Sequence, residues 1–253
     1  MQFLKGHNMI DLSIIIPCYL KNEELLNLTK STIHSFREAD LPKYELILVD
    51  DNSPLYGGYL RDEADVYIKH KENKGFSKSV NDGLNVARGE FVVVANNDIR
   101  VAKNFFEVSK EIFSMDKRVY SVHPRMCFYE EALLTGTKDF LQGRERWCQS
   151  SFFIQRNGYH RFPEHFKGTG GAYEDWFYWS RVREDEWKTA YTTRTAFQHK
   201  DSSTTQLIGE WSKYHEENRE LFKKHFKLYP EAYYEELYFD QMKMPWREEF
   251  TKL

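Results

Sequence analysis

The sequence predicts an α/β fold with a largely parallel sheet, and two observations support this prediction. Short apolar segments alternate with amphipathic segments from Leu12 to about Pro124. Strand, helix and strand at such short intervals imply right-handed crossovers between parallel strands. In addition, several apolar segments end abruptly in polar residues, and open parallel sheets bind ligands beyond the carboxyl ends of their strands. The sequence therefore predicts both the sheet and the edge at which a site lies.

The first part of the chain supplies the alternating elements. The strands are expected over 12–17, 44–50, 66–69 and 90–95, and the helices over 23–39, 77–87 and 105–113. The strands are apolar runs, whereas the helices repeat apolar residues at helical spacing. Ser77 is a candidate N-cap of the second helix, and Gly89 follows its end. The stretch over 54–58 is expected to interrupt the chain after the second strand.

Beyond about residue 124 the pattern becomes mixed. Strands are expected over 151–156 and 190–199, helices over 174–184 and 210–226, and a shorter helix through Tyr238 after a break at Pro230. The terminal helices are aromatic and amphipathic. Packing against the rest of the chain is therefore expected, and a homodimer face or a peripheral membrane contact is the alternative.

The composition excludes several classes of protein. The 253 residues include 36 basic and 39 acidic side chains, and the net charge of −3 does not favour nucleic acid or an anionic membrane as partner. Cys18, Cys127 and Cys148 share no metal-type spacing, which fits a reducing compartment. Neither a signal-peptide core over residues 1–8 nor a membrane-spanning run is present. A cytoplasmic protein is expected, with the inner face of a membrane as the alternative location.

Two of the predicted strand ends carry acids. Asp51 follows the strand over 44–50, and Asn97 and Asp98 follow the strand over 90–95. An acid at a strand end can accept hydrogen bonds from a nucleobase or ribose, and an acid near a diphosphate can hold a divalent cation. Neither a GxGxxG nor a Walker motif is present, so dinucleotide and P-loop sites are not supported. Helix capping and Asx turns remain the alternative role of each acid taken alone.

Together these motifs resemble glycosyltransferase family 2, the inverting GT-A enzymes, over roughly residues 12–205. The resemblance is carried by Ile14–Tyr19, Leu48–Ser53, Asn73–Phe76 with Asn81 and Gly83, and Gly89–Phe91 leading to Asn97 and Asp98. The Asn-x-Gly-Phe form is more similar to the rhamnosyltransferase-like branch than to the cellulose-synthase branch. The resemblance implies a Rossmann-like GT-A fold, with helices flanking a central, mostly parallel, mixed sheet and a C-terminal helical extension.

The resemblance also implies a domain organisation and a set of binding residues. The GT-A domain would cover 1–205, with a nucleotide-sugar half over 9–124 and an acceptor half over 125–205, and the helical extension would cover 206–253. The nucleotide-sugar-binding residues implied are Pro17, Tyr19, Asp51, Asn73, Gly75, Asn81 and Asn97. Asp98 and His199 would bind a divalent cation, Mn²⁺ or Mg²⁺. Asn96 stands where the family's metal motif has its first acid, so the cation site carries fewer charges.

A second constellation begins at Glu174 and Asp175. Two acids at a helix start stabilise the helix dipole in any protein, which is the alternative explanation for this pair. The resemblance implies that Asp175 is the general base that deprotonates an acceptor hydroxyl and that Glu174 positions it. Arg181 matches the family's arginine seven positions after the glutamate. Phe177 replaces an acid that is frequent in this motif. The candidate acceptor-binding residues are Tyr173, Trp176 and Arg181.

The function predicted is the inverting, metal-assisted transfer of a hexosyl or deoxyhexosyl group to a hydroxyl acceptor. The donor would be a UDP-, GDP- or dTDP-linked sugar, and the acceptor a glycan or another hydroxyl compound. A non-catalytic sugar-nucleotide-binding module is one alternative, motivated by Asn96 and Phe177. A sugar nucleotidyltransferase is a second alternative. It is disfavoured because Tyr19–Asn22 is not the glycine-rich, basic loop that such enzymes need after the first strand.

Overall fold

The structure is a computed structural model that describes residues 10–128, 132–137, 139–141, 150–166, 173–200, 211–230 and 251–252. The strands are β1 (Leu12–Cys18), β2 (Tyr44–Asp50), β3 (Val66–Lys69), β4 (Phe91–Ala95), β5 (Ile99–Val101), β6 (Val119–Phe128), β7 (Leu134–Thr135), β8 (Asp139–Leu141), β9 (Phe152–Arg156), β10 (Lys188–His199) and β11 (Thr251–Lys252). The helices are α1 (Glu23–Arg37), α2 (Gly57–Glu63), α3 (Gly75–Val86), α4 (Phe105–Met115), α5 (Glu174–Glu184) and α7 (Trp211–Phe226).

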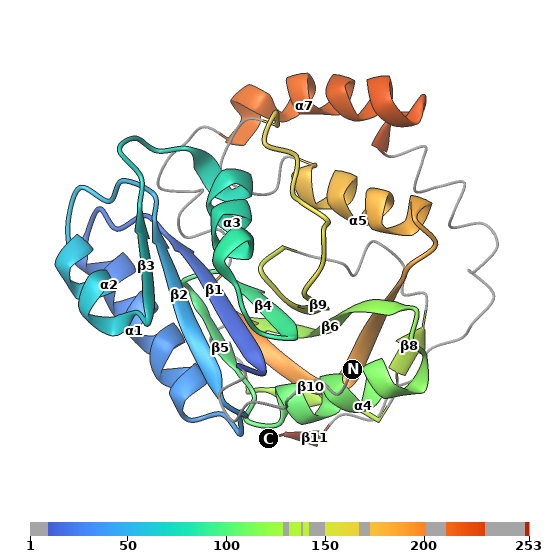
Figure 1. Cartoon of the computed structure of the whole chain (residues 1–253), viewed down its shortest axis with the longest axis horizontal. Coiled ribbons are helices and arrows are strands. Elements are labelled where there is room, and N and C mark those ends of the chain that lie inside the picture. Colours follow the sequence, from blue (N-terminus) through green and yellow to red (C-terminus); the bar gives the residue numbers. More distant parts are fainter. Residues whose placement is uncertain are drawn as a thin grey trace, which may run out of the picture.

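A single mixed sheet forms the centre of the described part of the chain (Figure 1). Its strands follow the order β3-β2-β1-β4-β9-β6-β10-β5, and β8 pairs with β10 beside this path. The strands β3, β2, β1 and β4 are parallel, as expected for the alternating first part of the chain. The antiparallel strand β9 then joins β4 to β6, and β10 pairs in parallel with β6. The prediction of a mostly parallel, mixed α/β sheet is confirmed.

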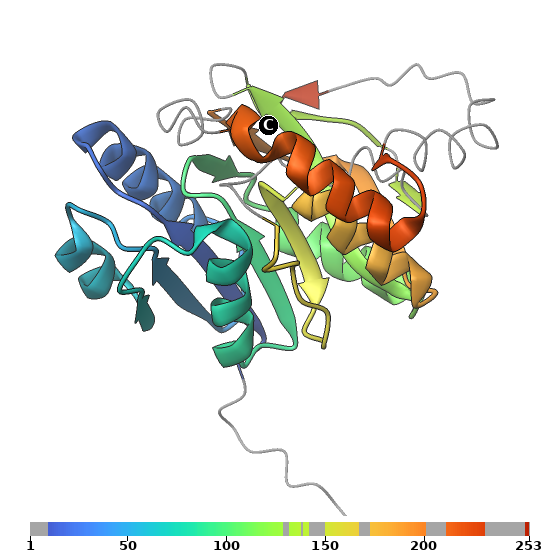
Figure 2. The same ribbon diagram turned by 90° about the horizontal axis from the view of Figure 1, so that it is seen from above.

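Alternate side chains along the strands face two different helical layers. Ile14 and Leu48 belong to a core with α1 and α4, whereas Ile15 and Val49 belong to a core with α3 and α5. This alternation follows from the two-residue period of a strand, and it explains why both faces are apolar. The helix α7 lies over α5 in both views (Figures 1 and 2), where aromatic residues of the two helices pack together.

Several elements differ from the sequence-based expectation. The helix α2 begins at Gly57, inside the stretch that was expected to be a chain break, and the ten-residue strand β6 was not expected. This strand carries buried Ser121 and His123 in an apolar segment, so its pattern is not that of a simple buried strand. Ser77 is not an N-cap, because α3 begins two residues earlier, at Gly75. The helix expected through Tyr238 lies outside the described residues.

The C-terminal part of the chain is closely connected to the rest. Phe222 of α7 is fully buried against α5, and β11 pairs with β7. The apolar side of α7 is therefore used in packing within the chain, in agreement with its amphipathic sequence. No helix among the described residues has the length and apolar character needed to cross a membrane.

Gly83 sets the distance between α3 and the sheet. A Cβ atom at this position would lie 2.5 Å from Cγ2 of Ile15 in β1, which is buried and cannot move aside without disturbing the core. The absence of a side chain therefore lets α3 lie directly on β1 and places the first turn of α3 beside the end of β2.

We expect Gly83→Ala to destabilise the protein by about 1–3 kcal/mol, because the added methyl group overpacks the contact with Ile15. Glycine-to-alanine changes in helices normally act in the other direction, by up to about 1 kcal/mol. Gly58→Ala in α2 is the matched control, since its Cβ would meet nothing within 4 Å. Urea unfolding of the two variants measures both effects, and a Gly83→Ala variant as stable as the wild type would contradict this account of the packing.

Candidate functional site

The carboxyl ends of β1 and β2 lie side by side and bring three predicted residues to one edge of the sheet. Pro17 pairs with Val49, and the backbone N–H of Asp51 donates to the carbonyl of Cys18 at 2.8 Å. Tyr19 is half-buried and follows directly. The parallel register of the two strands therefore places Pro17, Tyr19 and Asp51 at the same edge, as predicted.

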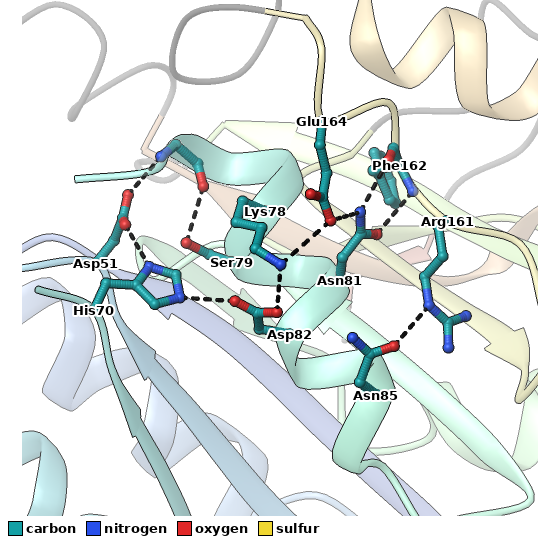
Figure 3. Close-up of polar contacts among 11 residues, drawn as sticks. Asp51, His70, Lys78, Ser79, Asn81, Asp82, Asn85, Arg161, Phe162 and Glu164 are labelled. Atoms are coloured by element: carbon teal, nitrogen blue, oxygen red, sulfur yellow. Dashed lines mark hydrogen bonds and ion pairs between the residues drawn. The ribbon is translucent and has the colours of Figure 1, made fainter. Parts of the chain in front are cut away.

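Asp51 holds the first turn of α3 (Figure 3). Its Oδ1 accepts the backbone N–H of Lys74 at 2.7 Å, and its Oδ2 accepts the N–H of Gly75 at 2.9 Å. Gly75 has φ 81°, in the left-handed region that favours glycine, which explains the residue type at this point of the motif. Asn73 is exposed and lies just before these two residues. The structure thus brings Asp51 and the segment around Asn73 and Gly75 together.

Two other residues predicted to bind the nucleotide make contacts within the protein. The side chain of Asn81 accepts the N–H of Phe162 at 2.8 Å and donates to the Phe162 carbonyl and to Glu164, both at 2.9 Å (Figure 3). Asn97 is buried and donates to the Thr29 hydroxyl of α1 at 2.9 Å. Asn81 therefore attaches a later segment to α3, and Asn97 attaches the turn after β4 to α1. Their contribution to nucleotide binding stays a prediction.

The turn after β4 meets the end of β10 at the predicted cation-binding residues. Asp98 is 3% exposed, and its backbone carbonyl accepts the N–H of Lys200 at 3.1 Å. The Nε2 atom of His199 lies 3.3 Å from Asp98 Oδ1, without hydrogen-bonding geometry, and 3.4 Å from the side-chain nitrogen of Asn96. The two predicted ligands and Asn96 therefore share one place.

These three side chains fit a divalent cation. Oδ1 of Asp98 is buried and has no hydrogen-bond partner among the described residues, an arrangement that costs free energy unless a cation or a donor reaches the atom. Carboxylate and imidazole groups ligate metals in proteins, and an amide does so through its oxygen, whereas the Asn96 atom that faces His199 here is the side-chain nitrogen. No group of three or more His, Cys, Asp or Glu side chains gathers anywhere in the described ranges. The remaining ligands would therefore have to come from a diphosphate and water.

The helix α5 presents the second pair of acids in its first turn. Tyr173 immediately before it has φ 69°, so the chain turns sharply into the helix. Glu174 is buried, whereas Asp175 is partly exposed and its Oδ1 accepts the N–H of Trp176 at 2.9 Å. Burial, followed by the charge of Glu174, raises the pKa of Asp175 well above the ordinary range of a carboxyl group. A carboxylate with a raised pKa is suited to accept a proton.

The predicted acceptor-binding residues lie where α5 meets α7. Tyr173 is 9% exposed, and its ring lies 4.7 Å from that of His215. Trp176 packs against the apolar cluster to which Tyr173 and Phe222 belong. Phe177, which replaces an acid of the motif, packs 5.3 Å from Phe226. The contact with α7 gives a physical reason for an aromatic residue at position 177, since a carboxylate there would be buried among rings.

Arg181 is exposed and lies beside α7. It pairs with Glu184 at 2.8 Å and lies 3.4 Å from Nε2 of His225 in α7, with nearly half of its side chain exposed. The structure therefore places Arg181 in a polar group on the surface between α5 and α7. Its role in acceptor binding stays a prediction.

Sequence reasoning did not identify His70 and Asp82 as parts of the site. His70 is buried and lies 2.7 Å from Asp51 and 3.0 Å from Asp82. A single histidine after a short strand has no distinguishing pattern. Its contacts with Asp51 and with Asp82 of α3 arise only from the tertiary structure.

Comparisons with known proteins identify relatives of this chain. Undecaprenyl-phosphate 4-deoxy-4-formamido-L-arabinose transferase of Proteus mirabilis (strain HI4320) is 32% identical over 95 residues, which are 35% of this chain and 29% of that protein. A crystal structure of S. aureus TarS is similar with a TM-score of 0.60 and 15% identity, over 79% of this chain and 63% of that chain. A structure of GalNAc-T7 with UDP, GalNAc and Mn²⁺ has a TM-score of 0.57 and 14% identity, over 77% and 44% of the two chains.

The structural matches establish a fold shared with GT-A glycosyltransferases, and the chain spans less than two thirds of the length of each of these relatives. The family described as Glycosyl transferase family 2 matches residues 13–189, which is more than half of the chain. This match includes Asp51, Asp98 and the acids at the start of α5, and ends near the start of β10. The chain therefore belongs to glycosyl transferase family 2.

Proposed function

We propose that this glycosyltransferase moves a sugar from a nucleoside-diphosphate donor to a hydroxyl acceptor with inversion, and that Asp175 is its general base. The observation that carries the proposal is the placement of Asp175, a partly exposed residue whose carboxyl group has a raised pKa, in the first turn of α5. The family match covers both this helix and the sheet edge that carries Asp51 and Asp98.

The proposed donor is a UDP-linked sugar, with GDP- and dTDP-linked sugars as the alternatives. S. aureus TarS has been solved with UDP and with UDP-GlcNAc, and these structures share the fold of this chain at TM-scores of 0.57 and 0.54. In the present chain, Asp51 and the backbone around Asn73 would lie along the nucleoside, because they meet at the carboxyl edge of the parallel strands.

The proposed reaction requires a base on one side of the sugar and charge neutralisation on the other. An alcohol is a weak nucleophile, so removal of its proton by Asp175 during attack lowers the barrier. Direct attack on the anomeric carbon, opposite the departing nucleoside diphosphate, inverts the configuration. Asp98 and His199, with Asn96, would hold a divalent cation, which when bound neutralises the charge that develops on the diphosphate.

Asp175→Asn should abolish transfer while leaving donor binding nearly intact. Loss of a general base costs roughly 10²–10⁴-fold in kcat, whereas the carboxamide has the same size and still accepts a hydrogen bond from Trp176. Radiolabelled transfer and calorimetric UDP binding measure the two effects. Asp185→Asn, at the exposed end of the same helix, is the control and should behave as wild type. Equal loss of donor affinity in Asp175→Asn would show that the residue binds the donor or supports the fold.

The rate of transfer should rise with pH through the raised pKa of Asp175. The base acts in its ionised form, and burial together with Glu174 disfavours that form, so activity is lower at acidic pH and increases as the proton is lost. Glu174→Gln removes the neighbouring charge and should shift the rising limb of the kcat profile to lower pH. An unshifted limb in this variant would assign the titration to another group.

Asp98→Asn should weaken the Mn²⁺-dependent part of UDP binding by about tenfold or more, since even outer-shell changes around metals commonly cost 10–100-fold. Calorimetry with and without Mn²⁺ measures the difference. Asp116→Asn is the control, because Asp116 pairs with Lys188 at 2.8 Å near the start of β10, at the opposite end of that strand from His199. Unchanged Mn²⁺ dependence in Asp98→Asn would exclude this carboxylate as a ligand.

A further inference from the structure

His70 connects two acids through both nitrogens of its ring (Figure 3). The residue follows β3 and is 5% exposed. Nδ1 lies 2.7 Å from Asp51 Oδ1, and Nε2 lies 3.0 Å from Asp82 Oδ2. An ionised carboxylate only accepts hydrogen bonds, so a ring nitrogen that carries a proton donates to the acid that it faces. Both contacts are largely buried, and a hydrogen bond to a charged acceptor is stronger than one between neutral groups.

The first of these contacts fixes the orientation of Asp51. Its Oδ1 receives two donors, from His70 and from the backbone of Lys74, while Oδ2 receives the N–H of Gly75. The carboxylate is thus held by groups on two different elements, the end of β3 and the first turn of α3. Without the imidazole, only the backbone of α3 among these donors would hold it.

The second contact attaches the imidazole to the body of α3. Burial raises the pKa of Asp82, but hydrogen bonds from Lys78 and His70 outweigh it and hold the pKa below its ordinary value. Lys78 lies 2.8 Å from Asp82 and 3.5 Å from Glu164. Asp82 is therefore ionised, and it lies one helical turn from Lys78. Its carboxylate contacts Nε2 of His70, the ring nitrogen that does not face Asp51.

The same part of α3 is also connected to α5, the helix that carries the proposed base Asp175. The side chain of Asn81, adjacent to Asp82, forms hydrogen bonds with both the N–H and the carbonyl of Phe162. The ring of Phe162 in turn stacks on that of Tyr178 in α5, with a centroid distance of 4.1 Å and an interplanar angle of 5°. A continuous set of contacts therefore runs from Asp51 through His70 and α3 to the helix that carries Asp175.

We propose that His70 is a positioning residue, which holds Asp51 and the first turn of α3 in the conformation that receives the donor's nucleoside. This inference rests on the proposed function for its ligand. It assigns to His70 no contact with the donor, because the two nitrogens of its ring are both used by acids. The expected consequence of losing the imidazole is weaker nucleotide binding, with greater motion at Lys74 and Gly75.

The test compares His70→Leu with Tyr67→Phe as a matched control. The first variant removes both contacts of the imidazole. The second removes the 2.6 Å hydrogen bond from the Tyr67 hydroxyl to Asp50, so it also takes a donor from a buried acid at the end of β2. Asp50 accepts the N–H of Ser53 rather than those of Lys74 and Gly75, so the control leaves the first turn of α3 untouched.

Two measurements on the full chain separate the inference from the proposed function. Titration with UDP in the presence of Mn²⁺ should show binding to His70→Leu weakened by about 10- to 100-fold, the range expected for a lost charge-assisted hydrogen bond. Amide hydrogen exchange without any nucleotide should become faster at Lys74 and Gly75. Tyr67→Phe should leave UDP affinity and both exchange rates within about twofold of wild type. His70→Gln, which keeps one donating side-chain nitrogen, should recover part of the affinity.

The outcomes are distinguishable. UDP affinity of His70→Leu equal to that of the wild type, or unchanged exchange at Lys74 and Gly75, would overturn the role of His70 and leave the proposed function standing. A wild-type protein that binds neither UDP, GDP nor dTDP would overturn the proposed function, and the exchange rates would then decide alone whether His70 holds this turn. If His70→Leu fails to fold, the same comparison is made with His70→Gln, for which wild-type affinity and exchange count against the inference.

Discussion

The hydrogen bonds between the Asp51 carboxylate and the first turn of α3 connect the carboxyl end of β2 to this helix. A helix start has backbone N–H groups without partners inside the helix, and here a side chain from the end of β2 accepts two of them. The acid thus directly follows a strand and at the same time accepts hydrogen bonds at the start of a helix. Capping and ligand binding are therefore not exclusive explanations for an acid at this edge, because the cap holds the acid where a ligand would meet it.

The close contact of α3 with the sheet and the aromatic contact of α5 with α7 arrange the two halves of the proposed site. Gly83 allows α3 to lie on β1, and Tyr178 and Trp179 of α5 belong to the same core as Val80 of α3. On its other side α5 is covered by α7, whose Phe222 is fully buried. The helix that carries the proposed base is thus packed from two directions, which suits a group that must keep its geometry during a reaction.

The proposed cation site differs from a preformed metal site, in which the protein supplies all or most of the ligands. Asp98 and His199 come from the turn after β4 and the end of β10, which are joined by a backbone hydrogen bond and by the pairing of β10 with β5. Asn96 contributes no charge, so the protein offers only one carboxylate among these three groups. Such a site would gain most of its affinity when a diphosphate supplies further oxygens, which would couple cation binding to donor binding.

The sequence by itself determined the alternating first part of the fold, because apolar runs and helical periodicity are local patterns, and the bounds of β2 and β3 agree with the residues expected from them. In the later, mixed part of the chain the bounds of α5 agree as well. The sequence also indicated Asp51, Asp98 and Asp175 as candidates. Only the tertiary structure decided what surrounds them. That Asn81 binds the backbone of Phe162, that Phe177 faces α7, and that His70 bridges two acids depend on contacts between segments far apart in the chain. No local pattern specifies which distant segment a side chain will meet, since that is decided by how the layers pack.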